Sequence, residues 1–206
     1  WLNLIRGSGF HNIYTHLKLG SNKPVLPFAD ARLLNILNHT FWFLPSVASC
    51  HAMKNLMMRN INSFYQDYEI IVCAGPEAGI GLNALPPVLR KMSDPLHSKT
   101  ITLSCGKLTT GVTVKPWTGV FMLRDTSAPE TYFQTAFRVQ SPWTINIENS
   151  PNKEENLKHE CYVFDFAPNR ALRLLTEYSC RLSLANNHPE SQVDEFIKFL
   201  PVLCFD

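Results

Sequence analysis

The sequence lacks several features that would assign it to a functional class at once. None of its six cysteines form a CxxC pair, so the paired spacing of most zinc sites and thiol redox motifs is missing. It has no apolar run of 18 residues and no signal-peptide layout, so no membrane partner is predicted and a reducing, cytoplasmic location is expected. The chain begins with Trp1 rather than Met, and we expect a processed chain or a piece of a longer one.

Charge is also scarce. Only 17% of the 206 residues are charged and the net charge is +2, a balance that permits nucleic-acid binding without indicating it. Apolar residues make up 45%, which is typical of a globular chain long enough for one domain. A zinc site that uses His159 and Cys161 is a minor alternative, because the paired spacing is absent, and no metal site is predicted.

Two stretches only partly match nucleotide-binding motifs. The stretch GIGLNA at 79–84 fits G-x-G-x-x-A, but Pro76 separates it from the preceding strand, and Pro86 and Pro87 are expected to stop any helix. The stretch CGKLTTG resembles a P-loop, but Ile101 stands where its first glycine is required. The chain is therefore predicted to have no phosphate cradle of its own. A self-contained nucleotide or dinucleotide enzyme that uses residues 79–81 stays an alternative.

Short apolar runs alternate with amphipathic segments along the rest of the chain. The runs predict buried strands at 40–47, 68–75, 99–106, 118–125 and 161–166. Helices are predicted at 29–37, 48–64, within 127–143 and at 169–183. In the second of these, Met53, Leu56, Met57 and Ile61 recur at helical spacing, and in the last Leu172, Leu175 and Tyr178 are predicted to face inward.

This alternation predicts an α/β fold with a mostly parallel sheet and helices on both faces. The preceding residues, 1–39, are predicted to be a linker or irregular N-terminal arm, because glycine and proline punctuate residues 1–27. Ligands of such sheets bind at the carboxyl ends of the strands. The loops that follow the predicted strands are therefore the first places to look for a site.

Two segments carry the candidate site residues. Thr109, Thr110 and Gly111 form a predicted turn after a buried strand, where small residues let backbone amides approach phosphate oxygens. Gln134 and Arg138 are spaced four apart and so lie on one face of a predicted helix. Arg138 stands in a stretch with few charges, which makes it either a surface residue or a group that binds an anion.

The order LTTGVTVKPWTGVFMLRD (108–125) followed by Gln134 and Arg138 resembles motifs V and VI of superfamily 2 helicases and translocases. TFWFLPSVASCHAMKNL (40–56) looks like their motif IV strand and helix. ECYVFDFAPNRALRLLTEYS (160–179) is similar to the end of that domain in helicase subunits associated with restriction systems. The resemblance covers roughly residues 40 to 185.

The resemblance implies that residues 40–206 form a second, RecA-like motor domain of a DNA helicase or translocase. ATP and Mg²⁺ would be bound mainly by a first RecA-like domain that this chain lacks. Other implied partners are DNA (RNA is not excluded) and nuclease or methyltransferase modules. Arg138 would meet the γ-phosphate of ATP, with Gln134 beside it. The residues implied to grip nucleic acid or couple that grip to ATP are Ser46, Thr109, Thr110, Gly111 and Thr113.

The sequence departs from the pattern Q-x-x-G-R-x-G-R in two places. Phe137 replaces the glycine before the arginine, and Ser141 replaces the second arginine. Either Arg138 acts alone, or Arg124 or Arg170 assists it, or ATP turnover is weakened. A RecA-like module that binds nucleic acid or protein without hydrolysis is the main alternative. An ordinary surface arginine and an ordinary turn at 109–111 are the alternatives for the residues themselves.

Overall fold

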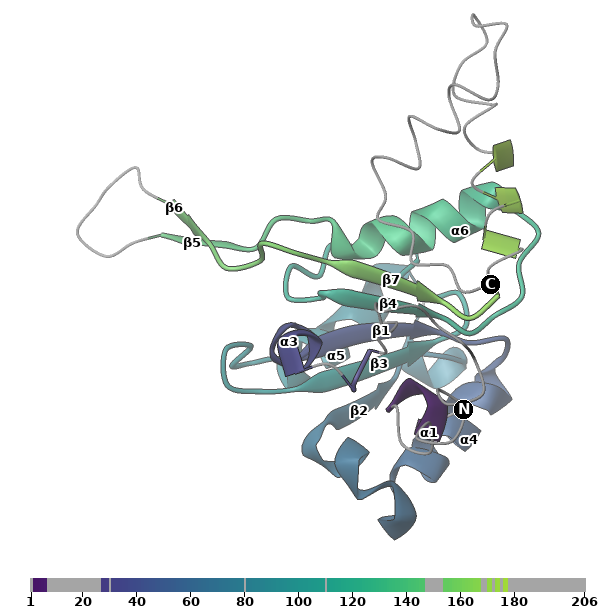
Figure 1. The fold of residues 1–206 in the computed structure, drawn as a ribbon, viewed down its shortest axis with the longest axis horizontal. Helices are drawn as coiled ribbons and strands as arrows, with labels where there is room; N and C mark the ends of the chain where they lie inside the picture. The colour runs from purple at the N-terminus through teal and green to yellow at the C-terminus, as the bar shows by residue number, and fades with distance from the viewer. Residues whose placement is uncertain are drawn as a thin grey trace, which may run out of the picture.

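The computed structural model describes residues 2–6, 27–29, 31–79, 81–109, 111–146, 154–167, 170–171, 173–174 and 176–177. Five of its strands form one sheet in the order β2-β3-β1-β4-β7, and every neighbouring pair is parallel. These strands are β1 (His39–Phe43), β2 (Glu69–Val72), β3 (Thr100–Ser104), β4 (Gly119–Met122) and β7 (Tyr162–Asp165). β2, β3, β4 and β7 lie within the predicted runs, and β1 begins one residue before the run predicted at 40–47. Figure 1 shows them side by side with their carboxyl ends at one edge.

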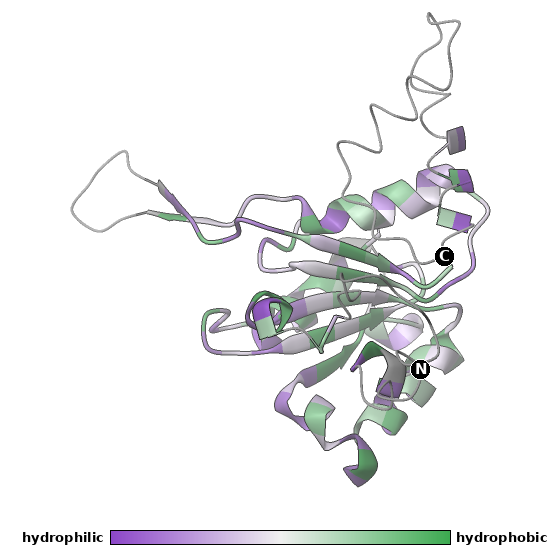
Figure 2. Ribbon diagram, in the orientation of Figure 1, coloured by the Kyte–Doolittle hydropathy of each residue, from purple (hydrophilic) through white to green (hydrophobic). Residues whose placement is uncertain are grey.

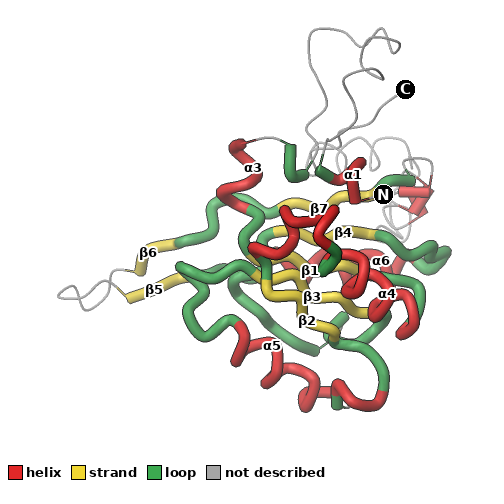
Figure 3. The backbone as a smooth tube through the Cα atoms, turned by 90° about the horizontal axis from the view of Figure 1, so that it is seen from below, coloured by secondary structure: helices red, strands yellow, loops and turns green. Residues whose placement is uncertain are grey.

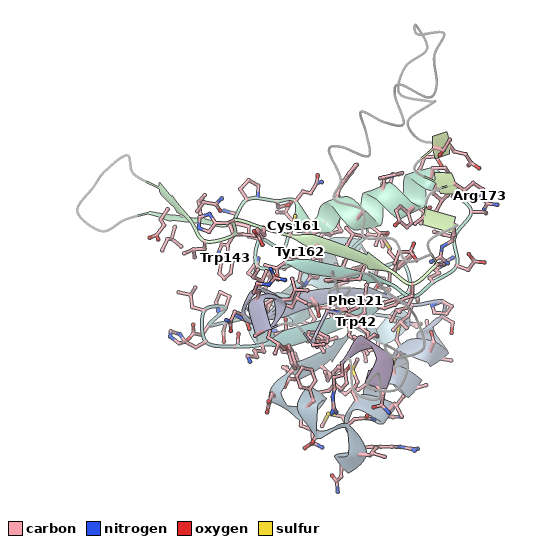
Figure 4. The ribbon with its side chains drawn as sticks, in the orientation of Figure 1. Trp42, Phe121, Trp143, Cys161, Tyr162 and Arg173 are labelled. Atoms are coloured by element: carbon pink, nitrogen blue, oxygen red, sulfur yellow. The ribbon has the colours of Figure 1, made fainter. Side chains whose placement is uncertain are left out.

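The central strands β1, β3 and β4 are buried along their whole length because both faces of the sheet are covered. On one face, α5 (Leu85–Lys91) and α6 (Pro129–Ala136) pack with the segment before β4 over side chains such as Phe41, Ile71 and Val120. On the other face, α4 (Val47–Met57) packs over side chains such as Trp42 and Phe121, whose rings stack with centroids 4.6 Å apart. Figure 2 shows the apolar strands between these layers, and Figure 4 labels the stacked pair.

The helices thus lie on both faces of a parallel sheet, as predicted, and the arrangement is consistent with a RecA-like domain. The view in Figure 3 shows the helical segments around the sheet. None of the helices within the described ranges has the length and apolar character that crossing a bilayer requires.

Parts of the predicted N-terminal arm belong to the core. A helical turn, α1 (Leu2–Ile5), buries Leu2 and Ile5, and α3 (Ala31–Ile36) buries Leu33 on the same face as α4. The hydroxyl of Tyr65 donates to the carbonyl of Leu2 at 3.0 Å. Most of the segment between these elements lies outside the described residues, and the boundary at residue 39 stays a prediction.

The helix predicted over 48–64 is shorter and less buried than expected. α4 ends at Met57, and a 3₁₀ segment, η1 (Asn60–Asp67), continues the chain to β2. Met57 is buried as predicted, but Leu56 is exposed and Ile61 is 80% exposed. The predicted spacing failed at Ile61 because the change from α to 3₁₀ geometry alters which positions face the sheet.

A two-stranded antiparallel ribbon had no counterpart in the sequence prediction. It pairs β5 (Thr144–Asn146) with β6 (Glu154–Asn156). Figures 1 and 3 show that it projects from the sheet beside the amino ends of the strands. Its three-residue strands are too short and too polar to give a period-two apolar pattern.

The helix predicted at 169–183 is described only in part. Residues 170, 171, 173, 174, 176 and 177 are helical, and Leu174 is fully buried against the α6 face of the sheet. The inward positions predicted for Leu172, Leu175 and Tyr178 lie outside the described residues.

His39 links the amino ends of β1 and β3. Its Nδ1 lies 2.9 Å from the hydroxyl of Thr100, and its Nε2 lies 2.8 Å from the carbonyl of Pro95. Since a carbonyl can only accept, Nε2 carries the proton and Nδ1 accepts from Thr100. Burial lowers the pKa of His39, and the bond to Pro95 opposes this only partly.

We expect this histidine to make the free energy of unfolding pH-dependent. The folded-state pKa is below the unfolded value, so its contribution is full above about pH 6.5 and is lost as the pH falls through the folded pKa. Urea unfolding at pH 7.5 and 5.5 measures the loss. His39→Gln should reduce the difference, whereas the exposed control His51→Gln should preserve it. Equal pH dependence in His39→Gln and the unmodified chain would contradict the assignment.

Candidate functional site

The carboxyl edge of the sheet, where ligands were expected, carries three cationic side chains that the chain itself already binds. Arg124 donates to the carbonyl of Cys105 at 2.9 Å and lies over the ring of Phe43. Lys107 donates to the carbonyl of Gly79. Arg170 pairs with two carboxylates on β7 and the loop after β4. These bonds and ion pairs connect neighbouring loops at the carboxyl edge of the sheet.

The turn after β3 uses its polar groups internally. Ser104 donates to the carbonyl of Lys107 at 2.7 Å, and the hydroxyl of Thr109 donates to the carbonyl of Gly106 at 2.7 Å. Thr109 is only 7% exposed. Its hydroxyl therefore shapes the turn, and any contact with a ligand at this point would come from the backbone or from a neighbouring residue.

Beyond Thr109 the turn opens to solvent. Thr110 lies outside the described residues. Gly111 has φ +64°, which favours glycine, and a Cβ there would meet no atom within 4 Å. Thr113 is exposed, whereas its neighbours Val112 and Val114 are buried under α6. Among the described residues of 109–113, Gly111 and Thr113 are the accessible ones.

Gln134 and Arg138 lie on α6 and the 3₁₀ turn that follows it, η4 (Phe137–Val139). Tyr132, Phe133 and Ala136 face the sheet, so Gln134 is left exposed on the other side. The Arg138 Nε donates to the carbonyl of Gln134 at 3.0 Å.

The guanidinium of Arg138 also donates through Nη1 to the carbonyl of Val112. This bond joins the two candidate segments, which are separated by 26 residues in the sequence. Arg138 has no carboxylate within salt-bridge distance in the described part of the chain. It is thus half-buried and bonded to two carbonyls, and no described carboxylate compensates its charge.

Arg138 lies away from the carboxyl edge. α6 starts after the carboxyl end of β4 and runs back along the sheet, so its last turn is near the amino ends of the strands (Figure 1). Trp143, which follows shortly, contacts the ring of His39 at the start of β1, with centroids 6.4 Å apart. The structure therefore separates Arg138 from the cations Arg124 and Arg170 at the other edge.

Ser46 lies on the face opposite Arg138. It is the N-cap of α4: its hydroxyl accepts from the backbone N–H of Ser49, and the Ser49 hydroxyl accepts from the backbone N–H of Ser46. A reciprocal cap of this kind explains a serine here without a ligand. The structure does not bring Ser46 together with the other candidate residues.

In the dinucleotide-like motif, Gly79 follows one 3₁₀ turn, η2 (Pro76–Ala78), and Gly81 begins the next, η3 (Gly81–Ala84). Gly79 has φ +79°, and a Cβ there would lie 2.9 Å from the backbone of Asn83, so the glycine is required by the turn. The prediction that prolines stop a helix here was wrong. Pro86 and Pro87 lie in the first turn of α5, where a missing N–H costs no hydrogen bond.

A second polar region lies beside η4, and sequence reasoning missed its central residue. Gln140, Asn156, Lys158 and Cys161 line a cavity of about 220 Å³ together with Val139, Pro142, His159 and Glu160. Lys158 is 8% exposed. A lone lysine in a polar stretch gives no periodic signal, so only the fold could show that it is buried.

Within the described ranges, no three His, Cys, Asp or Glu side chains form a group suited to a metal ion. His159, Glu160 and Cys161 all line the cavity, but their side chains do not form such a group. The described cysteines Cys50, Cys73, Cys105 and Cys161 are free thiols.

No protein-family model matches the chain. The chain is similar to a Mycoplasma pneumoniae protein named "Putative type II restriction enzyme and methyltransferase RM.MpnORF110P C-terminus". The two are 34% identical over 166 residues, which is 80% of this chain but 22% of the relative. The chain thus spans about a fifth of the length of this relative.

Proposed function

We propose that this chain is the second RecA-like motor domain of an ATP-dependent DNA translocase or helicase that belongs to a restriction-modification protein. The similarity to a relative named as a restriction enzyme and methyltransferase supports the restriction-modification link. Because the match spans only 22% of that relative, other domains of a longer protein would supply the nuclease and methyltransferase modules. In this proposal the longer protein binds DNA, and RNA is the alternative nucleic acid.

The observation that carries the motor assignment is the bond between Arg138 and Val112. It ties the segment 109–113, proposed to contact DNA phosphates, to the helix that presents Gln134 and Arg138. A shift in one segment would therefore move the other. A connection of this kind supports coupling between nucleic-acid binding and an ATP site.

In this proposal ATP and Mg²⁺ are bound mainly by a first RecA-like domain, and Arg138 approaches the γ-phosphate when the two domains close. Phosphoryl transfer spreads negative charge over the γ-oxygens, and a guanidinium placed there stabilises the transition state. Arg138 has no carboxylate partner among the described residues, which suits this role. Its guanidinium bonds to the carbonyls of Gln134 and Val112 would either orient the side chain toward the phosphate or break when the domains close.

A binding module without hydrolysis is the second candidate. The same contacts favour it, because a guanidinium already bonded to two carbonyls has fewer donors left for a phosphate. A self-contained dinucleotide enzyme has less support, since η3 separates Gly79 from the N-terminus of α5.

ATP hydrolysis by two preparations tests the proposal. The isolated chain should show no DNA-stimulated turnover, because its sequence has no complete P-loop, and only weak DNA binding with a shallow salt slope. The full-length protein that carries the chain should hydrolyse ATP faster when DNA is added. Stimulated turnover by the isolated chain would refute the assignment of a second domain. DNA binding by the full-length protein with no ATP turnover would instead identify a binding module.

A further inference from the structure

Lys158 is a buried cation without a carboxylate partner in the described part of the chain. Its Nζ donates to the carbonyl of Lys115 at 2.9 Å and to the carbonyl of Trp117 at 3.1 Å. Lysine is almost never this buried unless it is paired, because removing an ammonium from water is costly. The two carbonyls compensate only part of this cost.

Burial lowers the pKa of Lys158 to about 8, and the nearby thiol of Cys161 acts weakly in the opposite direction. A neutral amine has two hydrogens, which are enough for both carbonyls. The positive charge and the third hydrogen of the ammonium are therefore not needed to hold the loop before β4. They are available to a ligand in the cavity that Lys158 lines.

The other groups around the cavity favour an oxygen-rich anion. Gln140 and Asn156 contribute amides, and His159 contributes an imidazole whose N–H can donate. The titratable groups that line the cavity besides Lys158 are His159, Glu160 and Cys161. Glu160 opposes an anion, but its carboxylate accepts from the hydroxyl of Tyr162, which partly satisfies it.

The cavity also adjoins the candidate arginine. Val139 and Gln140, which line it, directly follow Arg138 at the end of α6. Figure 4 labels Trp143, Cys161 and Tyr162 at the end of the sheet from which β5 and β6 project. It labels Arg173 at the opposite end. A cation from the segment after β6 thus reaches the same end of α6 as Arg138.

We propose that this cavity is a phosphate-binding subsite in which the ammonium of Lys158 binds a phosphoryl group, aided by the amides of Gln140 and Asn156. The phosphoryl group belongs either to a nucleotide or to a nucleic-acid backbone. The choice of these two sources rests on the proposed function, whereas the phosphate chemistry rests on the cavity alone.

Protection of Lys158 from an amine-modifying reagent tests the subsite in the 206-residue chain, with inorganic phosphate as the probe. Modification of the peptide that contains Lys158 is measured by mass spectrometry at pH 8, with chloride at equal ionic strength as the reference. Phosphate should slow the modification, because it stabilises the unreactive ammonium. Unchanged modification would overturn the proposal.

Phosphate affinity is then compared by the phosphate-dependent rise in Tm. Lys158→Gln keeps two donors for the carbonyls but removes the charge, and should weaken binding by about tenfold or more. Lys115→Gln is the matched control, since it removes the same charge from an exposed neighbour and leaves the backbone carbonyl in place. Equal loss in both variants would show general screening and would refute the subsite. If Lys158→Gln does not fold, the protection result on the unmodified chain decides alone.

Two further probes, ATP and a single-stranded oligonucleotide, identify the source of the phosphate. The protection experiment and the ATP turnover experiment test the subsite and the motor assignment independently. Protection by phosphate without ATP turnover in the full-length protein supports the subsite and refutes the motor. ATP turnover with no protection of Lys158 by any probe refutes the subsite and leaves the motor intact.

Discussion

Replacing Arg138 by alanine is expected to lower DNA-stimulated ATP turnover by about 10³–10⁵-fold in the full-length protein that carries this chain. An arginine that meets charge developing on the γ-phosphate lowers the barrier more than it strengthens ground-state binding. DNA affinity without nucleotide should therefore change little. Arg138→Lys should recover little activity, since an ammonium lacks the planar set of donors that also reaches two carbonyls.

The structural role of Arg138 must be separated from its role in turnover. Loss of its bonds to the carbonyls of Gln134 and Val112 should itself cost about 1–3 kcal/mol of folding free energy. Turnover is therefore expressed per folded molecule, with folding followed by circular dichroism. Arg173→Ala is the control, because it removes an exposed arginine from the last helical segment. A lowered Tm with normal turnover per folded molecule would make Arg138 purely structural.

The second large effect is expected at the carboxyl edge, where two carboxylates bind one guanidinium. Arg170 contacts Asp165 at 2.6 Å and Asp125 at 3.0 Å, yet the side chain of Asp165 is 7% exposed and that of Asp125 is 93% exposed. Asp165 also accepts from the backbone N–H of Ala167 at 2.9 Å. Burial, together with the negative charge of Asp165, raises the pKa of the neighbouring Tyr132 hydroxyl.

Asp165→Asn should lower the free energy of unfolding by about 3–5 kcal/mol, because it leaves a largely buried guanidinium without its closest charge. Asp125→Asn, which removes a charge from the same arginine at the surface, should cost less than about 1 kcal/mol. Urea unfolding of both variants provides the comparison, and the corresponding drop in Tm for Asp165→Asn is on the order of 10 °C. Similar losses in the two variants would show that burial does not decide the strength of this pair.

The sequence alone determined the α/β class and the position of every strand in the parallel sheet. It did so because a strand covered on both faces is rich in apolar residues, and runs such as 40–47 and 118–125 are too short for buried helices. The helix around Gln134 and Arg138 was predictable for a related reason. Its apolar positions recur with the period of a helix that covers a sheet.

Only the tertiary structure decided what those segments contact. Hydrophobic period gives the face of a helix but not its neighbour, so the bond from Arg138 to Val112 could not be predicted. The burial of Lys158 depends on carbonyls about 40 residues earlier, which reach it through the pairing of β4 with β7. The partners of single polar residues are set by three-dimensional packing. An isolated polar side chain belongs to no periodic pattern, so the sequence around it does not indicate what it will contact.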